Sequence, residues 1–200
     1  METIPLFPLN LVLFPGGRLP LRIFEPRYTD LVSECLRTDS GFGVCLLKAG
    51  NEVGGGAQCF EVGTYARIVD WCKLDDGLLG ITVEAGRRFR IEHFSERPNQ
   101  LLQGDIQWLE ENGAEEDLKI GEHYQSLQML LTRIFDHFEI SYDDQAQRLE
   151  EATWLGYRLA ELLPLEPHTK QTFLEMGDSL KRLAQIQQVV NETNIADFSG

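Results

Sequence analysis

Apolar positions change their spacing about halfway along the chain. Up to about residue 109 they form short runs rich in β-branched and aromatic residues, which are typical of strands. Beyond that point they recur every three or four residues, which is typical of amphipathic helices. The pattern therefore predicts a β-rich region at 1–112 and a helical region at 113–200, joined by the polar segment EENGAEED at 110–117.

The β-rich region is predicted to contain a series of short strands and one helix. Asp75-Asp76-Gly77 fits a tight hairpin turn between two of the strands. Pro26 suits a first helical position, and apolar residues at helical spacing follow it, so a helix is expected at 26–37. The predicted strands are residues 18–24, 42–48, 63–74, 78–84, 88–94 and 101–109.

Prolines punctuate the start of the chain, at positions 5, 8, 15, 20 and 26. Proline cannot donate a backbone hydrogen bond, so this stretch is expected to be extended and to lie at edges and corners of the β structure. Gly16-Gly17 allows a sharp turn that brings Val12–Phe14 close to Leu19–Ile23. Eight aromatic residues of this region are interpreted as its core: Phe7, Phe14, Phe24, Phe60, Trp71, Phe89, Phe94 and Trp108.

The helical region is predicted to be a small bundle of four helices with short connections. One apolar stripe runs from Ile120 to Phe138 and a second from Leu149 to Leu163. Proline begins the third helix, PHTKQTFLEM at 167–176. Asp178 suits the N-cap of the last helix, which is expected to run to about Val190. The fold class is therefore α+β.

Net charge argues against anionic partners. The chain carries a formal charge of −14, and the helical region is the more acidic part. Such a surface repels phosphate backbones and anionic lipid, so neither nucleic acid nor a membrane is expected as a partner. The nearest basic cluster is Arg87-Arg88-Arg90, in which Arg88 and Arg90 share one face of a strand. No signal peptide and no membrane-length apolar run is visible, which favours a cytoplasmic location.

No catalytic or metal-binding motif stands out. The cysteines, Cys35, Cys45, Cys59 and Cys72, form no CxxC pair and have no nearby histidine, so they are expected to be reduced thiols without a metal. Gly54-Gly55-Gly56 lacks the strand, lysine and helix of a phosphate-binding loop. No cofactor and no catalytic residue are therefore assigned, although a triad dispersed along the sequence stays open.

Several segments together resemble a known family. They are IPLFPLNLVLFPGGRLPLRIFEPRY, FEVGTYARIVDWCKLDDGLLGITVEAGRRFRI and, in the helical region, KQTFLEMGDSLKRLAQI. Their order is similar to that of the N-terminal substrate-binding domain of Lon-type ATP-dependent proteases. This resemblance implies a twisted, PUA-like β subdomain followed by a helical bundle, in agreement with the two spacings.

The sequence departs from a complete Lon protease. It contains no GxxxxGK[ST] motif for ATP, and it ends at Gly200, before a Ser-Lys proteolytic module would occur. The resemblance therefore implies a stand-alone form of the substrate-binding domain that is not itself an enzyme. Its expected partner is a polypeptide or another protein, while the client and the oligomeric state stay undefined.

The leading hypothesis is a module that binds exposed or unfolded polypeptide or docks a partner protein. Its candidate binding residues are Phe24, Glu25, Arg27 and Tyr28, where the strand meets the helix. The alternative for these residues is structural, with Phe24 and Tyr28 in the core and Glu25 capping the helix. The alternative function is a PUA-like nucleic-acid-binding protein or a small enzyme with an unrecognised site.

Overall fold

The computed structural model describes residues 2–49, 58–110, 120–140 and 148–193. The chain divides into two compact units, Met1–Leu109 and Glu110–Gly200. The first is β-rich and the second helical, which confirms the predicted α+β class. No helix among the described residues is long and apolar enough to cross a membrane.

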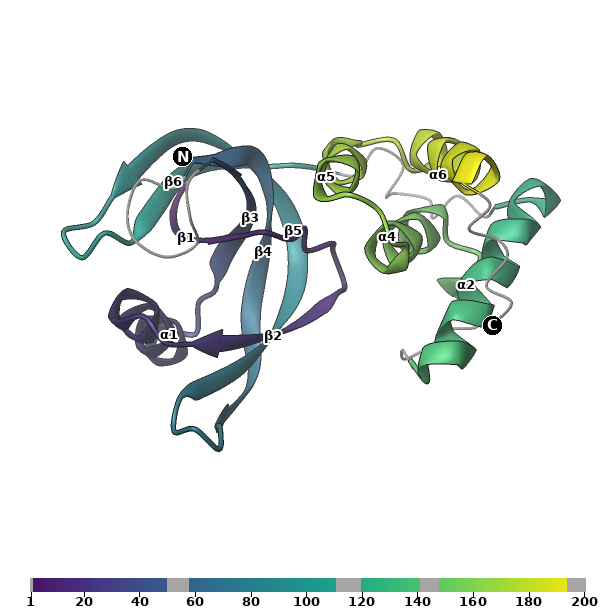
Figure 1. The fold of residues 1–200 in the computed structure, drawn as a ribbon. Coiled ribbons are helices and arrows are strands. Elements are labelled where there is room, and N and C mark those ends of the chain that lie inside the picture. The colour runs from purple at the N-terminus through teal and green to yellow at the C-terminus, as the bar shows by residue number, and fades with distance from the viewer. Residues whose placement is uncertain (1, 50–57, 111–119, 141–147, 194–200) are drawn as a thin grey trace. The chain divides into compact units, whose positions relative to one another are not determined.

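Six strands of the first unit form one mixed sheet (Figure 1). Its order is β2-β5-β4-β3-β1-β6, and β5 also pairs with β6, so five of the strands close into a barrel and β2 extends from β5. The β4–β5 hairpin extends past β2 in Figure 1. The strands are β1 (Glu2–Leu9), β2 (Arg18–Ile23), β3 (Phe42–Ala49), β4 (Gln58–Lys73), β5 (Leu79–Glu96) and β6 (Leu102–Trp108).

The first strand, β1, lies inside the strand order, although its prolines favoured an edge position. Its residues 2–5 pair with β6, and its residues 6–9 pair with β3. Each half of the strand is therefore paired on one side only. Pro5 and Pro8, which have no backbone N–H to donate, can be accommodated for this reason. Pro20 does lie in an edge strand, β2, as its chemistry favours.

Two apolar clusters hold the first unit together. One fills the barrel interior and includes Leu6, Phe89 and Ile91. The other lies between the sheet and helix α1 (Pro26–Thr38), which contributes Leu31 and Val32. Burial of these side chains is the main favourable contribution to folding of this unit.

Local turns follow the predicted chemistry. Gly77 has a φ of 86° and ends the β4–β5 turn, where its N–H donates to the carbonyl of Leu74 at 2.8 Å. Gly16 has a φ of 75°, and the N–H of Gly17 donates to Phe14 at 2.9 Å. Glycine enters the left-handed region without a steric penalty, which is why these two turns can be so tight.

The helical unit contains a short 3-10 turn (Glu122–Tyr124) and four described helices. The Asp178 carboxylate accepts a hydrogen bond from the N–H of Lys181 at 3.0 Å, so Asp178 caps the last helix as predicted. That helix continues to Thr193, three residues beyond its expected end. The four helices are α2 (Gln125–Phe138), α4 (Ala152–Leu162), α5 (Pro167–Glu175) and α6 (Ser179–Thr193).

A buried polar network centred on Arg182 joins α4, α5 and α6. Arg182 is fully buried, and it donates from Nε to the carbonyl of Phe173 at 3.1 Å and from Nη2 to that of Met176 at 2.5 Å. Its guanidinium also lies 3.9 Å from the ring centroid of Tyr157. Arg182 of α6 thus satisfies carbonyls at the end of α5, where a helix has no internal donors.

Candidate functional site

The candidate site begins where β2 passes into α1. Glu25 is the N-cap residue, with an extended backbone, and its carbonyl accepts the N–H groups of Tyr28 and Thr29 at 3.0 and 3.1 Å. Its carboxylate does not cap the helix. It pairs instead with Arg27, with Nη2 and Oε2 3.1 Å apart. Glu25 therefore starts the helix with its backbone and orients Arg27 with its side chain.

Arg27 and Tyr28 have structural partners. The Arg27 side chain is only 11% exposed, and its Nη1 donates to the carbonyl of Gln100 at 3.0 Å. Its guanidinium lies 4.8 Å from the centroid of the Tyr28 ring. Tyr28 is buried and stacks on Phe7 with ring centroids 3.9 Å apart, and burial raises the pKa of Tyr28 to about 12. Of the four predicted site residues, only Phe24 is widely exposed.

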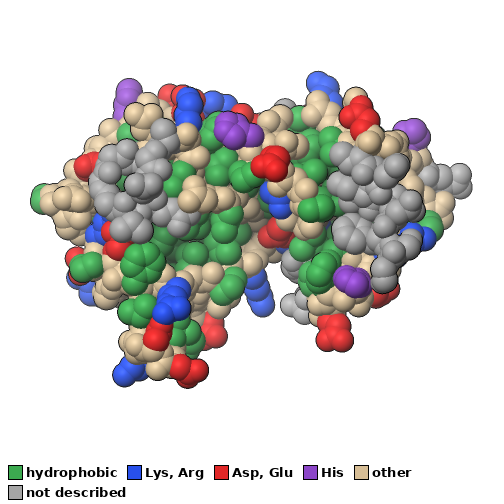
Figure 2. Space-filling view, viewed as in Figure 1, with side chains coloured by type: hydrophobic (Ala, Val, Ile, Leu, Met, Phe, Trp, Pro, Cys, Tyr) green, Lys and Arg blue, Asp and Glu red, His purple; other side chains and the backbone are tan. Residues whose placement is uncertain are grey.

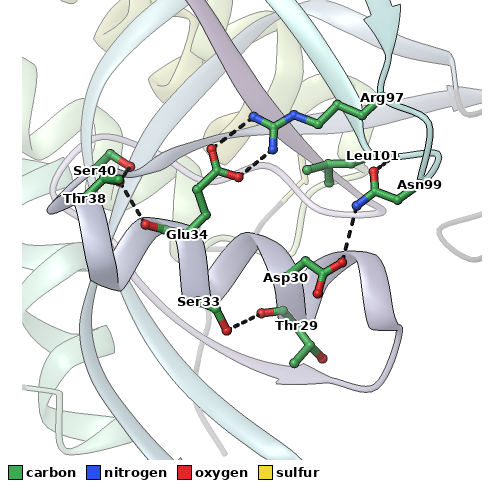
Figure 3. Close-up of polar contacts among 9 residues, drawn as sticks. All are labelled: Thr29, Asp30, Ser33, Glu34, Thr38, Ser40, Arg97, Asn99 and Leu101. Carbon is green, nitrogen blue, oxygen red and sulfur yellow. Dashed lines mark hydrogen bonds and ion pairs between the residues drawn. The ribbon is translucent and has the colours of Figure 1, made fainter.

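The turn between β5 and β6 holds α1 in place (Figure 3). Arg97 forms a two-pronged ion pair with Glu34, at 2.5 and 3.1 Å. Asn99 donates to Asp30 at 3.5 Å on the same side of the helix. Glu34 accepts two bonds from a cation, and this lowers the pKa of its carboxyl. These contacts hold the middle of α1, the helix that follows Phe24 and Glu25, against the barrel.

Large apolar side chains are exposed at the end of the sheet where β2 leads into α1. Phe24 is 59% exposed and directly follows the Ile23–Leu79 pair. Trp71 is 61% exposed and lies in the row formed by Leu21, Ile81 and Trp71 on β2, β5 and β4. Figure 2 shows hydrophobic side chains gathered on one face of this unit. Exposed apolar area of this kind is typical of interaction surfaces.

The interpretation of the aromatic residues as core was wrong for Phe24, Trp71 and Phe94, which are exposed. For Trp71 the reason lies in the neighbouring strand. β3 pairs with β4 only as far as Ala66, so beyond this point β4 has β5 as its single neighbour. An alternating sequence pattern does not reveal where a neighbouring strand stops.

The arginine cluster does not form a basic patch. Arg88 is buried, Arg90 pairs with Glu61 at 3.4 Å, and the guanidinium of Arg87 lies 5.0 Å from the ring centroid of Trp108. A nucleic-acid surface requires several accessible cations. These three residues therefore give no support to the nucleic-acid alternative.

The four cysteines are free, and three of them are buried. A hydrogen bond between the thiols of Cys45 and Cys59, together with burial, raises the pKa of Cys45, which weakens it as a nucleophile. Across the described ranges, no group of three His, Cys, Asp or Glu side chains lies close enough to hold a metal ion.

Comparison with known proteins defines the class to which this fold and surface belong. The chain belongs to the family of ATP-dependent protease La (LON) substrate-binding domains, whose model matches residues 3–192. The PUA-like β unit followed by helices, expected from the sequence, is the fold of this family.

Individual relatives agree with this assignment. Lon protease 2 of Myxococcus xanthus is 28% identical over 199 residues, an alignment that covers 95% of this chain and 24% of that protein. The chain thus spans about a quarter of the length of this relative. A crystal structure of a Lon N-terminal domain protein from Xanthomonas campestris is 35% identical, with a TM-score of 0.75 and coverage of 94% and 98% of the two chains. The N-terminal domain of the Mycobacterium avium complex Lon protease shares the fold at 15% identity, with a TM-score of 0.67 and coverage of 97% and 99%.

Proposed function

We propose that this chain is a non-catalytic module that binds exposed apolar segments of unfolded polypeptides. The observation that carries the proposal is the exposure of two large aromatic side chains, Phe24 and Trp71, at one end of the β2–β5–β4 sheet. Aromatic residues provide much of the binding energy at protein interfaces because they bury a large area at a small entropic cost. Membership of a substrate-binding family supports a polypeptide as the ligand.

The four residues predicted from the sequence would have different roles in this site. Phe24 would contact the bound segment directly, because it is the exposed one of the four. The Glu25–Arg27 ion pair would hold the backbone that presents Phe24. Tyr28, which is buried, would support this junction from the core side through its stack on Phe7. Glu25, Arg27 and Tyr28 are thus proposed as positioning residues.

Absence of catalysis is part of the same proposal. The matched family is a substrate-binding domain, and the chain aligns with a quarter of the length of a Lon protease. The purified chain is expected neither to hydrolyse ATP nor to cleave casein, with or without ATP. Either activity, if it persisted through further purification, would identify the chain as an enzyme.

Binding can be tested with reduced, carboxymethylated lactalbumin, which remains unfolded in buffer. Fluorescence anisotropy of the labelled lactalbumin should show saturable binding to the wild-type chain. Phe24→Ser and Trp71→Ser should each weaken binding by roughly fivefold to thirtyfold, the effect of losing an interface aromatic residue. Both side chains are exposed, so circular dichroism of these variants should match that of the wild type.

Phe138→Ser provides a matched control in the helical unit. Phe138 is 58% exposed, nearly the same as Phe24, but it lies at the end of α2. The control should bind lactalbumin with wild-type affinity. Absence of wild-type binding at tens of micromolar across several unfolded clients would overturn the proposal, as would equal losses in all three variants.

A further inference from the structure

A hollow of about 670 Å³ opens at one end of the barrel, away from the aromatic surface described above. Its described lining residues lie on three strands of the β-rich unit, β1, β5 and β6. The buried Ile106 forms its base, and Trp108 forms one wall. The remaining lining residues are Glu2, Glu92 and Gln107. The volume falls within the range of small-ligand pockets.

The wall residue Trp108 is held in a fixed orientation. Its Nε1–H donates to Oε2 of Glu2 at 2.9 Å, and the rings of Tyr65 and Phe89 contact it edge to face with centroids 5.5 and 6.5 Å away. The guanidinium of Arg87 already lies over this indole at 5.0 Å, yet Arg87 does not line the hollow. The same ring is therefore suited to a cation, and part of it faces the hollow.

The two carboxylates at the hollow differ from most others in the unit. Six carboxylates among its described residues have an arginine within 4.0 Å: Glu25, Glu34, Asp39, Glu61, Asp76 and Glu84. Neither Glu2 nor Glu92 has such an ion pair in the part of the chain that the structure describes. A cation that entered the hollow would meet both charges without having to displace an arginine of the protein.

We propose that this hollow binds the basic side chain, arginine or lysine, of a polypeptide held by the module. The inference rests on the proposed function, and it adds to it a preference for clients with a cationic residue near their apolar segment. The stem of the side chain would pack on Ile106 and Trp108, as long cationic side chains pack on apolar surfaces. Its charged end would lie between Glu2 and Glu92. The net charge of −14 favours the approach of such clients.

A pair of small probes separates charge from shape. Nα-acetyl-arginine amide carries the guanidinium, and Nα-acetyl-citrulline amide has nearly the same shape without the charge. The indole N–H signal of Trp108, assigned with Trp108→Phe, should shift saturably with the arginine probe. It should respond at least roughly fivefold more weakly to the citrulline probe, given the worth of exposed ion pairs. Equal responses to the two probes, or no response to either, would overturn the proposal.

Variants locate the two charges. Glu92→Gln keeps the Glu2–Trp108 hydrogen bond, and it should weaken arginine binding by roughly twofold to fivefold. The double variant with Glu2→Gln should weaken it further. Glu96→Gln is the matched control, since Glu96 is exposed on the same strand but does not line the hollow. Unchanged binding in the double variant, or an equal loss in the control, would refute the assignment.

The result with the arginine probe can be interpreted separately from the test with unfolded lactalbumin. If lactalbumin binds through Phe24 and Trp71 but the arginine probe does not shift Trp108, only the inference about the hollow fails. If the arginine probe binds and lactalbumin does not, the proposed function fails and the hollow is a cation site without a polypeptide role, which also refutes the preference stated here.

Discussion

Arg97 and Glu34 join the β5–β6 turn to the middle of α1 by two hydrogen bonds between one guanidinium and one carboxylate. Sixty-three residues separate them in the sequence. Paired forks of this kind are stronger and more directional than single ion pairs. α1 begins at Pro26, two residues after Phe24, so the pair holds the helix that follows the proposed binding surface.

Removing this pair should loosen α1. Arg97→Ala is expected to lower the free energy of unfolding by about 1 kcal/mol. This value is at the upper end of the range for ion pairs that are partly exposed. Amide hydrogen exchange of α1, measured alongside urea unfolding, should become faster. Arg18→Ala is the control, because the side chains of the Arg18–Glu84 pair are 65% and 45% exposed, against 27% and 36% for Arg97 and Glu34. A larger loss for Arg18→Ala would contradict this ranking.

The same pair predicts a pH dependence. Hydrogen bonding to Arg97 lowers the pKa of Glu34 below its ordinary value of 4.5. A depressed folded-state pKa means that the unfolded state binds more protons as the pH falls below 4.5. The stability that Glu34 contributes is therefore present above that pH and is lost as the pH falls through the folded-state pKa. The difference in unfolding free energy between wild type and Glu34→Gln should therefore shrink as the pH falls below 4.5. A constant difference down to pH 2.5 would argue against the ion pair.

Local signals in the sequence predicted a large part of this fold. Pro26, the Asp76-Gly77 turn and the Asp178 cap each act within a few residues, and each lies where it was expected. β5 was predicted as two strands because Ala85-Gly86-Arg87 interrupts the alternation. In the structure one strand continues through this point with an extra residue in a bulge.

Other features depend on distant partners and could not be predicted in this way. Closure of the barrel by pairing of β5 with β6, and the placement of β1 inside the sheet, are determined by strands far apart in the sequence. The junction between strand and helix that carries Phe24 could be located from the sequence, but the exposure of Trp71 depends on where β3 ends. The hollow beside Trp108 depends on three strands meeting at one end of the barrel.

Tyr28 should ionise at an unusually high pH. Burial raises its pKa from 10.0 to about 12, so an alkaline absorbance titration should contain a tyrosine component near pH 12 that Tyr28→Phe removes. A raised folded-state pKa means that the folded state retains its proton while the unfolded state loses it. The unfolding free energy of wild type should therefore fall relative to Tyr28→Phe as the pH rises from about 10 to 12. Circular dichroism checks folding at each pH, and a late component that survives in the variant would contradict the prediction.

The barrel interior should not tolerate a methyl group at Gly43. A Cβ there would lie 2.5 Å from Cζ of Phe89 and 2.7 Å from Cδ2 of Leu6, both fully buried. Gly43→Ala should therefore lower the free energy of unfolding by about 1–3 kcal/mol, the usual effect of overpacking a core. Gly86→Ala is the control, because the nearest atom to its Cβ would be 3.5 Å away. Urea unfolding followed by the indole N–H signal of Trp108, which contacts Phe89, reports on this region directly.

A second substitution tests whether Phe89 is the cause of that loss. Phe89→Leu alone should destabilise the barrel by leaving space beside Gly43, whereas in Gly43→Ala the smaller side chain should make room for the methyl group. The double variant should therefore be less destabilised than the two single losses added together, by about 0.5 kcal/mol or more, as for residues in direct contact. Strict additivity would mean that the methyl group is resisted elsewhere, at Leu6 or in the backbone pairing of β1 with β3.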